Sequence, residues 1–504
     1  MTSGLRRAGV APGSRVASIL TNTPLAVRGI AATWLAGGTL GSFPVPSRGM
    51  DLEEYGEHLR GLVTLFEPDA MFVDSSLLTL LPEDVQNRAN ARSWESVAGR
   101  GSIPFSPPAL DDVAFVQFSS GSTSLPKGCM LTARAIEAQV ELILTMVDAR
   151  RGADCDVSWL PLSHDMGLFG NLLPSWLGDL EFVLSTPERF TMSPRTWFDD
   201  VADFGAALTC GTDTALQVAT RRHTHQLRRP LRLRTVILGA ERIHWETLTR
   251  AVEGFGADGL TSEALMPAYG MAEATLAVTS TPAREAPRHV VVDGVSLADG
   301  AVEDVAADHP ASTRIVACGR PCPGVEVPGL RREELAELRV RSVSLAGGYL
   351  GDEASTNERF RDGTFYTGDL GFQRDGYVYP VGRMDDVIPI GGRNVYAREI
   401  EAAVDDLSMI RSGCSTLIQR GEGQAQRLVL LTEIKDGCSD FRGLARQAAA
   451  LAMRKAGVAL DECVFLEKGL LPKTPSGKIQ RYRCRQGLDD GRLSLIARVE
   501  FKSE

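Results

Sequence analysis

The chain has 504 residues, of which 43% are hydrophobic and 23% charged, and its formal net charge is −10. This length suggests roughly two to four domains that can bury full hydrophobic cores. The mild acidic balance argues against general nucleic-acid binding, which requires a basic face. The arginine-rich run 221–234 fits a solvated helix face and loop better than a recognition patch.

The use of cysteine and the pattern of apolar residues indicate the cellular compartment of the protein. The nine cysteines show no Cys-x-x-Cys spacing, and the pair Cys318 and Cys322 has no second pair or histidine cluster to complete a zinc site. This usage is typical of a reducing compartment. The N-terminus lacks the apolar run of a signal peptide, and no apolar stretch reaches about 18 residues without a charge. We therefore expect a soluble cytoplasmic protein without a membrane span.

The first two thirds of the chain alternate short apolar runs with helical patterns, which is typical of an α/β fold. Helices are predicted at 25–37 and 133–151, the second with Thr132 as its N-cap. Buried strands are predicted at 15–20, 70–74, 113–119, 234–240 and 313–318.

From about residue 337 the pattern changes to short alternating segments separated by Asp362-Gly363 and Asp375-Gly376, which predicts antiparallel hairpins in a small β subdomain. A smaller α/β pattern follows, with strands at 414–419, 427–434 and 462–467 and a helix at 441–456. We therefore expect a large N-terminal domain of mixed α/β sheets, residues 1–383, and a small mobile α+β lid domain, residues 384–504.

The stretch "SSGSTSLPKG" (119–128) follows a predicted strand and combines hydroxyls, glycines and one lysine, which together suit an anion. It is not a Walker A loop, because Pro126 precedes Lys127 and Gly128 follows it. A phosphate-binding loop and a structural turn remain equal alternatives on these residues alone.

Two further motifs could serve a nucleotide. In "AYGMAEAT" (268–275), Tyr269 could stack on a purine and Glu273 could ligate Mg²⁺, although a core tyrosine and a helix cap explain them as well. In "FYTGDLG" (365–371), Asp369 could accept both hydroxyls of a ribose, or it could belong to a tight turn.

Two polar motifs carry less information. Lys478 follows a Pro-Ser-Gly turn, where a lysine is usually only solvated. His164 stands beside Asp165 in "PLSHDMG" (161–167), but no nucleophile motif such as Gly-x-Ser-x-Gly accompanies them, so a gating or structural role is expected.

In their order along the chain, these motifs resemble those of the adenylate-forming superfamily of acyl-CoA synthetases, peptide-synthetase adenylation domains and luciferases. The resemblance runs from about residue 7 to the end, and its motifs are 119–128, "GAE" (239–241), 268–275, "YTGDLG" (366–371), "GRMDDVIPIGGRN" (382–394) and "PKTPSGKIQR" (472–481).

Further details resemble the fatty-acyl-AMP ligase branch of that superfamily: Ser124 in the loop, and the segments 160–168, 317–324 and 269–278. Two features depart from the branch. The segment 349–367 is compact where that branch carries a longer insertion, and the chain begins late relative to the family, as if an opening strand and helix were missing or the start were misassigned.

The resemblance implies a role for each motif residue. The phosphate loop comprises Ser119, Ser120, Gly121, Ser122, Thr123, Ser124 and Lys127, with Thr123 and Glu273 holding Mg²⁺. The nucleotide-binding residues are Gly239, Ala240, Glu241, Ala268, Tyr269, Gly270, Met271, Asp369 and Arg383.

The remaining roles concern catalysis and the acyl substrate. Lys478 reaches in from the lid as a catalytic lysine, His164 stands at the mouth of an acyl tunnel, and Asp385 is the hinge. Gly391 and Gly392 form the loop on the thiol side, and the tunnel candidates are Phe169, Cys210, Gly211 and Thr212. No charged residue stands among these candidates, which favours a hydrophobic or bulky acid over an amino acid.

The family makes an acyl-adenylate from a carboxylic acid and Mg·ATP and releases pyrophosphate. The acceptor is open at this stage: Ser124 and the His-Asp-Met-Gly motif favour a carrier-protein phosphopantetheine or a partner thioester-forming enzyme, whereas the compact segment favours CoA. A non-catalytic nucleotide-binding scaffold is less expected, because four charged motif residues are intact: Lys127, Glu273, Asp369 and Lys478. A luciferase-like oxygenase shares the motifs. Natural product biosynthesis is a context that the family suggests.

Overall fold

The computed structural model describes residues 1–46, 52–99, 101, 104–118, 126–224, 226–384, 387–390, 393–421, 426–473 and 479–501. Within these ranges no helix combines the length and the apolar character needed to cross a membrane.

The N-terminal sheet has six strands in the order β4-β3-β1-β2-β5-β6. They are β1 (Arg15–Ile19), β2 (Thr39–Phe43), β3 (Ala70–Val73), β4 (Ala91–Ser93), β5 (Val113–Phe118) and β6 (Gly128–Thr132). Only the β5–β6 pair is antiparallel among the described strands of this sheet. The strands predicted at 15–20, 70–74 and 113–119 are confirmed.

A second sheet of seven strands has the order β15-β12-β11-β10-β9-β7-β8. Its strands are β7 (Cys155–Ser158), β8 (Glu181–Leu184), β9 (Leu208–Gly211), β10 (Thr235–Leu238), β11 (Leu265–Gly270), β12 (Ala277–Ser280) and β15 (Arg320–Pro321). The five strands from β11 to β8 pair in parallel, so their carboxyl ends meet at one edge. Ligands bind beyond this edge in open α/β sheets.

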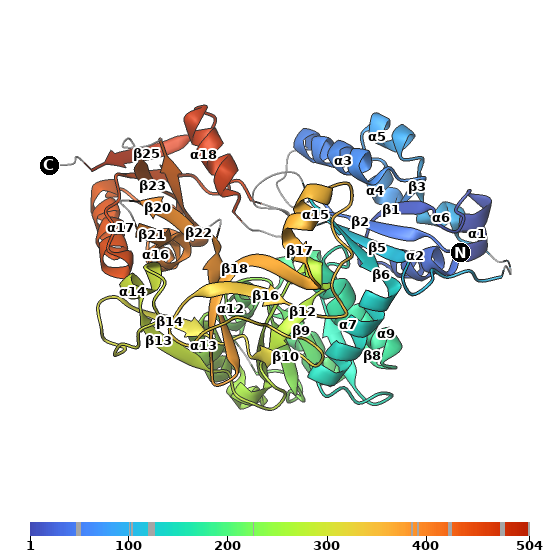
Figure 1. Cartoon of the computed structure of the whole chain (residues 1–504), viewed down its shortest axis with the longest axis horizontal. Helices are drawn as coiled ribbons and strands as arrows, with labels where there is room; N and C mark the ends of the chain where they lie inside the picture. Colours follow the sequence, from blue (N-terminus) through green and yellow to red (C-terminus); the bar gives the residue numbers. More distant parts are fainter. Residues whose placement is uncertain are drawn as a thin grey trace.

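Helices cover these sheets, as Figure 1 shows. They are α1 (Thr2–Arg7), α2 (Pro24–Leu35), α3 (Leu52–Phe66), α4 (Ser75–Leu78), α5 (Glu83–Arg88), α6 (Trp94–Val97), α7 (Ala133–Met146), α8 (Asp165–Gly167), the π-helical segment η1 (Leu168–Leu172), α9 (Leu173–Leu177), α10 (Pro187–Met192), α11 (Thr196–Phe204), α12 (Asp213–Arg222) and α13 (Trp245–Phe255). Helix α14 (Gly294–Ala298) instead lies against the C-terminal part of the chain. Three single 3₁₀ turns add η2 (Gly256–Asp258), η3 (Ser262–Ala264) and η4 (Ala272–Ala274).

Helix α7 begins as predicted and ends earlier. The Thr132 hydroxyl accepts from the Ala135 N–H at 3.1 Å, which confirms the N-cap. Apolar side chains at a spacing of three and four residues, among them Val140 and Ile143, bury one face. The predicted extension to residue 151 is wrong, because Asp148 adopts a left-handed φ of 50° that a helix cannot continue through.

The predicted hairpins are confirmed in the sheet built by β16 (Ala336–Val340), β17 (Phe360–Arg361), β18 (Thr364–Arg374) and β19 (Tyr377–Arg383), with α15 (Glu353–Arg359) leading into β17. Asp362-Gly363 and Asp375-Gly376 all have positive φ, as two-residue hairpin turns of this type require. The predicted strand at 313–318 is β14 (Ser312–Val316), which pairs with β13 (His289–Asp293).

The C-terminal part forms its own body, drawn in orange to red in Figure 1. A hairpin of β20 (Val387–Ile390) and β21 (Arg393–Tyr396) leads into a four-stranded sheet of β22 (Ile410–Arg420), β23 (Arg427–Ile434), β24 (Glu462–Leu466) and β25 (Leu495–Glu500). Its helices are α16 (Ala397–Asp405), α17 (Phe441–Ala456) and α18 (Arg481–Asp489). The Lys455 ammonium of α17 donates to the Ser312 carbonyl, which joins this body to β14.

Candidate functional site

Three residues predicted from separate motifs meet at one corner of the site. Register places Asp369 of β18 opposite Arg383 of β19. The Arg383 Nε donates to one carboxylate oxygen of Asp369 at 3.0 Å, and the Tyr269 hydroxyl donates to the other at 2.5 Å. Burial and the charge of Asp369 raise the pKa of Tyr269 well above its usual value, so the hydroxyl stays protonated and donates.

The turn after β11 needs a glycine and sets the position of the motif residues beyond it. A Cβ at Gly270 would lie 1.9 Å from the Leu276 carbonyl oxygen. That oxygen accepts from the Met271 N–H at 2.8 Å, which closes the turn around η4 and Glu273. Because Gly270 has no side chain, β11 and β12 can approach each other closely enough to form the turn that carries Glu273.

The ends of β10 and β11 lie side by side as the predicted adenine slot requires. A Cβ at Gly239 would contact the Ala268 carbonyl oxygen at 3.4 Å, and Ala240 follows with a φ of 66°. Glu241 points toward α12, where its carboxylate accepts from the Thr214 N–H at 2.5 Å. The structure thus brings Gly239 and Ala268 together and directs the Glu241 carboxylate to a helix N-terminus.

Lys127 and Glu273 are joined through a tyrosine that the sequence analysis did not single out. The Lys127 ammonium lies 4.7 Å from the centroid of the Tyr349 ring and donates to the Ser355 hydroxyl at 2.9 Å. The Tyr349 hydroxyl donates to Glu273 at 2.8 Å. Burial and the charge of Glu273 raise the pKa of Tyr349, which keeps it a donor.

Backbone pairing holds this cluster in register. The Leu350 N–H donates to the Gly128 carbonyl at 2.8 Å, and the Ala346 N–H donates to the Glu273 carbonyl at 2.8 Å. The segment 346–350 therefore fastens the end of the candidate phosphate loop to the Glu273 turn. Its position at the start of the compact segment 349–367 was the available sequence signal for Tyr349.

His164 caps a short helix. Its Nδ1 accepts from the Met166 N–H at 3.3 Å and lies 2.7 Å from an Asp165 oxygen. The preceding chain is anchored by Asn22, whose amide donates to the Leu160 carbonyl at 2.9 Å and whose oxygen accepts from the Leu162 N–H at 3.0 Å. This segment is fixed to the N-terminal sheet, and His164 is about one third exposed at its end.

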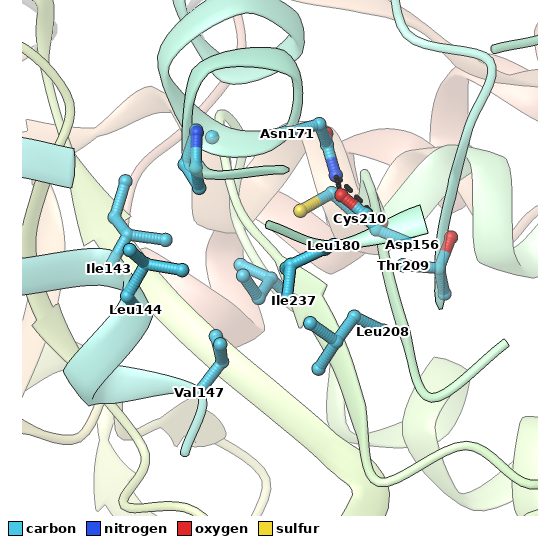
Figure 2. Close-up of a pocket in the computed structure, with 12 residues that line it drawn as sticks. Ile143, Leu144, Val147, Asp156, Asn171, Leu180, Leu208, Thr209, Cys210 and Ile237 are labelled. Atoms are coloured by element: carbon cyan, nitrogen blue, oxygen red, sulfur yellow. Dashed lines mark hydrogen bonds between the residues drawn. The ribbon is translucent and has the colours of Figure 1, made fainter. Parts of the chain in front are cut away.

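The four tunnel candidates have different surroundings. Cys210 lines a cavity between the second sheet and α7 (Figure 2). Phe169 is fully buried with its ring edge-on to Phe115. A Cβ at Gly211 would meet the Trp197 ring at 2.2 Å on the opposite face of the strand, and the Thr212 hydroxyl caps α12.

Several predicted residues lie outside the described residues and stay predictions: Ser119, Ser120, Gly121, Ser122, Thr123, Ser124, Asp385, Gly391, Gly392 and Lys478. The described part of the chain holds no group of three or more His, Cys, Asp and Glu side chains that could bind a metal ion. Glu273 fits Mg²⁺ all the same, because proteins hold this ion with one or two carboxylates and the substrate's phosphates.

The family model for AMP-binding enzymes matches residues 1–350, and the chain belongs to this family of adenylate-forming enzymes. The chain is 30% identical, over 78% of its length and 71% of the relative's, to the medium-chain-fatty-acid–[acyl-carrier-protein] ligase JamA of Moorena producens. It is 28% identical, over 77% of its length and 70% of the relative's, to the long-chain-fatty-acid–AMP ligase FadD32 of Mycolicibacterium smegmatis.

Among solved structures, one from a study of fatty acyl-adenylate ligases of E. coli and L. pneumophila superposes with a TM-score of 0.88 at 26% identity. The match covers 97% of this chain and 91% of the other. The fold predicted from the sequence, a large mixed α/β domain followed by a small α+β part, is therefore confirmed.

Proposed function

We propose that the chain uses Mg·ATP to activate a carboxylic acid as its acyl-adenylate, for transfer to the phosphopantetheine thiol of a carrier protein or to a partner enzyme. Two clusters of side chains support this proposal. Tyr269, Asp369 and Arg383 converge at one corner, and Lys127 is linked to Glu273 through Tyr349. A ribose acceptor, a phosphate-binding cation and a metal-binding carboxylate are the groups that bound Mg·ATP requires.

In the proposed reaction, a carboxylate oxygen of the acid attacks the α-phosphorus of ATP. The bond from this phosphorus to the oxygen of the β-phosphate breaks, and pyrophosphate leaves with that electron pair. Because two anions must approach each other, the protein contributes positioning and charge neutralisation. Lys127 and Ser119–Ser124 would hold the β- and γ-phosphates, and Lys478 would bridge the carboxylate and the α-phosphate.

Mg²⁺, held by Glu273 and Thr123, would supply neutralisation of the phosphate charge. Asp369 would accept from the ribose hydroxyls while Arg383 and Tyr269 fix the rotamer of its carboxylate. Asp385 would act as the hinge that retracts Lys478 after adenylation and brings Gly391 and Gly392 toward the thiol.

The similarity to FadD32, a fatty-acid–AMP ligase, supports an acyl-adenylate, and the similarity to JamA, a fatty-acid–[acyl-carrier-protein] ligase, supports a carrier-protein acceptor. One observation favours a second acceptor, CoA. The segment that leads from Tyr349 to β18 is compact, with α15 as the helix that it contains. We also propose a cytoplasmic site of action, which the nine free cysteines support.

Pyrophosphate release across a panel of carboxylic acids, with and without CoA or a carrier protein, tests this function. We expect release with a suitable acid in the absence of any thiol and no acyl-CoA product. Efficient acyl-CoA formation would assign CoA as the acceptor, and no release with any acid would reject adenylation.

A further inference from the structure

A cavity lies against the second sheet, with chemically different walls. Figure 2 shows Ile143 and Leu144 of α7, with Val147 directly after that helix, on one side and Asp156 and Asn171 on the other. None of the described residues that line it is Lys, Arg or His. The enclosed space accommodates about one water molecule.

The polar wall is a connected network. The Asn171 amide donates to both oxygens of Asp156, at 2.9 and 3.2 Å, and the Ser175 hydroxyl donates to one of them at 3.2 Å. Asp156 is 4% exposed, Asn171 1% and Ser175 1%. A carboxylate can accept about four hydrogen bonds, so this network leaves Asp156 with acceptor capacity toward the cavity.

The helix that carries Asn171 has unusual geometry. Residues Leu168–Leu172 form a π-helical segment, a geometry that is frequent at functional sites. Gly170, in the middle of this segment, lines the cavity, and a Cβ there would lie 3.0 Å from Leu276. The π-helical turn therefore places Gly170 at the wall of the cavity and aims Asn171 at Asp156.

The cavity lies below the predicted adenine slot. Ile237 of β10 lines it, and Gly239, in that slot, stands two residues further along the chain, directly after the end of β10. Met166 and Leu276 separate the two spaces: both contact the Cβ position of Gly170, and the Met166 sulfur lies 3.9 Å from the Cβ position of Gly239.

Strand register gives the distance between Asp156 and the level of Gly239, measured along the strands. Asp156 pairs with Leu208 and Leu208 with Thr235, four residues before Gly239. At about 3.3 Å per residue, Asp156 therefore lies ~13 Å below the level of Gly239. An acyl chain that starts at the α-phosphate and passes Met166, whose flexible thioether adapts to its surroundings, would end at Asp156.

We propose that this cavity is the far end of the acyl pocket and that Asp156, held by Asn171, binds a hydrogen-bond donor at the distal end of the acid. The substrate is then an acid with a terminal hydroxyl or ammonium group rather than a plain hydrocarbon end. This inference rests on the proposed function and narrows it. It also departs from the expectation, drawn from tunnel candidates without charge, of a hydrophobic or bulky acid.

The test compares pyrophosphate release with straight-chain acids of matched length that end in a methyl, a hydroxyl or an amino group. The wild-type kcat/KM should favour a donor-bearing acid over the methyl-ended acid by about 10- to 100-fold, because a missing donor leaves a buried acceptor unpaired. Asp156→Leu should reverse this preference. Asp156→Asn should strongly reduce the preference for the acid that ends in an amino group. It should only weakly reduce the preference for the acid that ends in a hydroxyl.

Asp213→Asn is the matched control. It changes a buried aspartate that bonds to His244 and Thr247, away from the cavity, and should leave the selectivity ratio unchanged. Release that is equal for all three ends in the wild type, or a ratio unaltered in both Asp156 variants, would overturn the inference while leaving adenylation intact. If Asp156→Leu does not fold, the inference is tested by the selectivity ratio of the wild type and by that of the isosteric variant Asp156→Asn. Absence of release with every acid would instead reject the proposed function.

Discussion

The nucleotide corner of Tyr269, Asp369 and Arg383 and the cavity against the second sheet each depend on one aspartate. Asp369 is half-buried and Asp156 is buried, and the two carboxyls have different partners. Asp369 is bound by a cation, Arg383, and by the Tyr269 hydroxyl. Asp156 is bound by the neutral groups of Asn171 and Ser175. Burial among neutral groups opposes ionisation and raises the pKa of the Asp156 carboxyl. Asp156 is therefore suited to a substrate that brings its own donor, because such a donor would stabilise the ionised form that Asn171 and Ser175 do not fully compensate.

The largest expected effect is on the free energy of unfolding and concerns the Asp156 carboxyl. Burial raises the pKa of Asp156 from 3.8 to about 7, against the opposing hydrogen bonds from Asn171 and Ser175. With a pKa raised on folding, the stabilising contribution is complete below about pH 4 and is lost as the pH rises through 7. Asp156→Asn should therefore gain stability over the wild type between about pH 4 and 7, by up to the order of 4 kcal/mol.

Urea unfolding of both proteins at several pH values measures this difference. The neighbouring thiols Cys155 and Cys210 do not titrate in the window, because burial raises the pKa of Cys155 to about 12 and that of Cys210 well above its usual value. A stability difference independent of pH would show that Asp156 ionises normally in the folded protein.

Catalysis should depend most on the lid. Lys478→Ala should lower the rate of acyl-adenylate formation by about 10²–10³, because it removes a cation from the reacting oxygens. Transfer from preformed acyl-adenylate should stay largely intact. Separate assays of the two half-reactions check this, and equal loss in both would contradict the role proposed for the lysine.

Breaking the nucleotide corner should weaken ATP binding. Asp369→Asn removes the charge that Arg383 faces and should raise the KM for ATP by about 10- to 100-fold, the value of a hydrogen bond to a charged group. Asp375→Asn, at the exposed turn of the same hairpin, is the matched control and should behave as the wild type. Initial-rate measurements at varied ATP concentration compare the two, and similar KM values would remove Asp369 from the site.

A smaller effect is expected at the link between Lys127 and Glu273. Tyr349→Phe keeps the ring beneath the ammonium and removes the hydrogen bond to Glu273. It should raise the Mg²⁺ concentration needed for half-maximal rate by about tenfold, whereas Tyr349→Leu should also raise the KM for ATP. A Phe variant with an unchanged Mg²⁺ dependence would reduce Tyr349 to a packing role.

The same contrast explains what the sequence could and could not predict. Asp369 and Tyr269 were predicted because each stands beside a glycine in a recognisable motif, "YTGDLG" and "AYGMAEAT". Asp156 stands inside a four-residue buried strand, and its partner Asn171 is 15 residues away on a helix. No local pattern distinguishes such a pair from ordinary core residues, and only packing brings Tyr349 between Lys127 and Glu273.

Helices, strands and hairpins were predictable because apolar periodicity and Asp-Gly turns depend on neighbouring residues in the chain, as the β18–β19 hairpin shows. The end of α7 was not, since the left-handed Asp148 is a local choice that periodicity does not reveal. Gly211 and Cys210 illustrate a similar limit: neighbours in sequence, they face opposite sides of one strand.

The central claim, attack of a carboxylate on the α-phosphorus of ATP, is tested most directly with an acid labelled with ¹⁸O in its carboxyl group. After acyl transfer, we expect one labelled oxygen in AMP and none in pyrophosphate, because the transferred acyl group leaves its former carboxylate oxygen on the α-phosphate. Release of ADP with the label in inorganic phosphate, or AMP without label, would contradict the account.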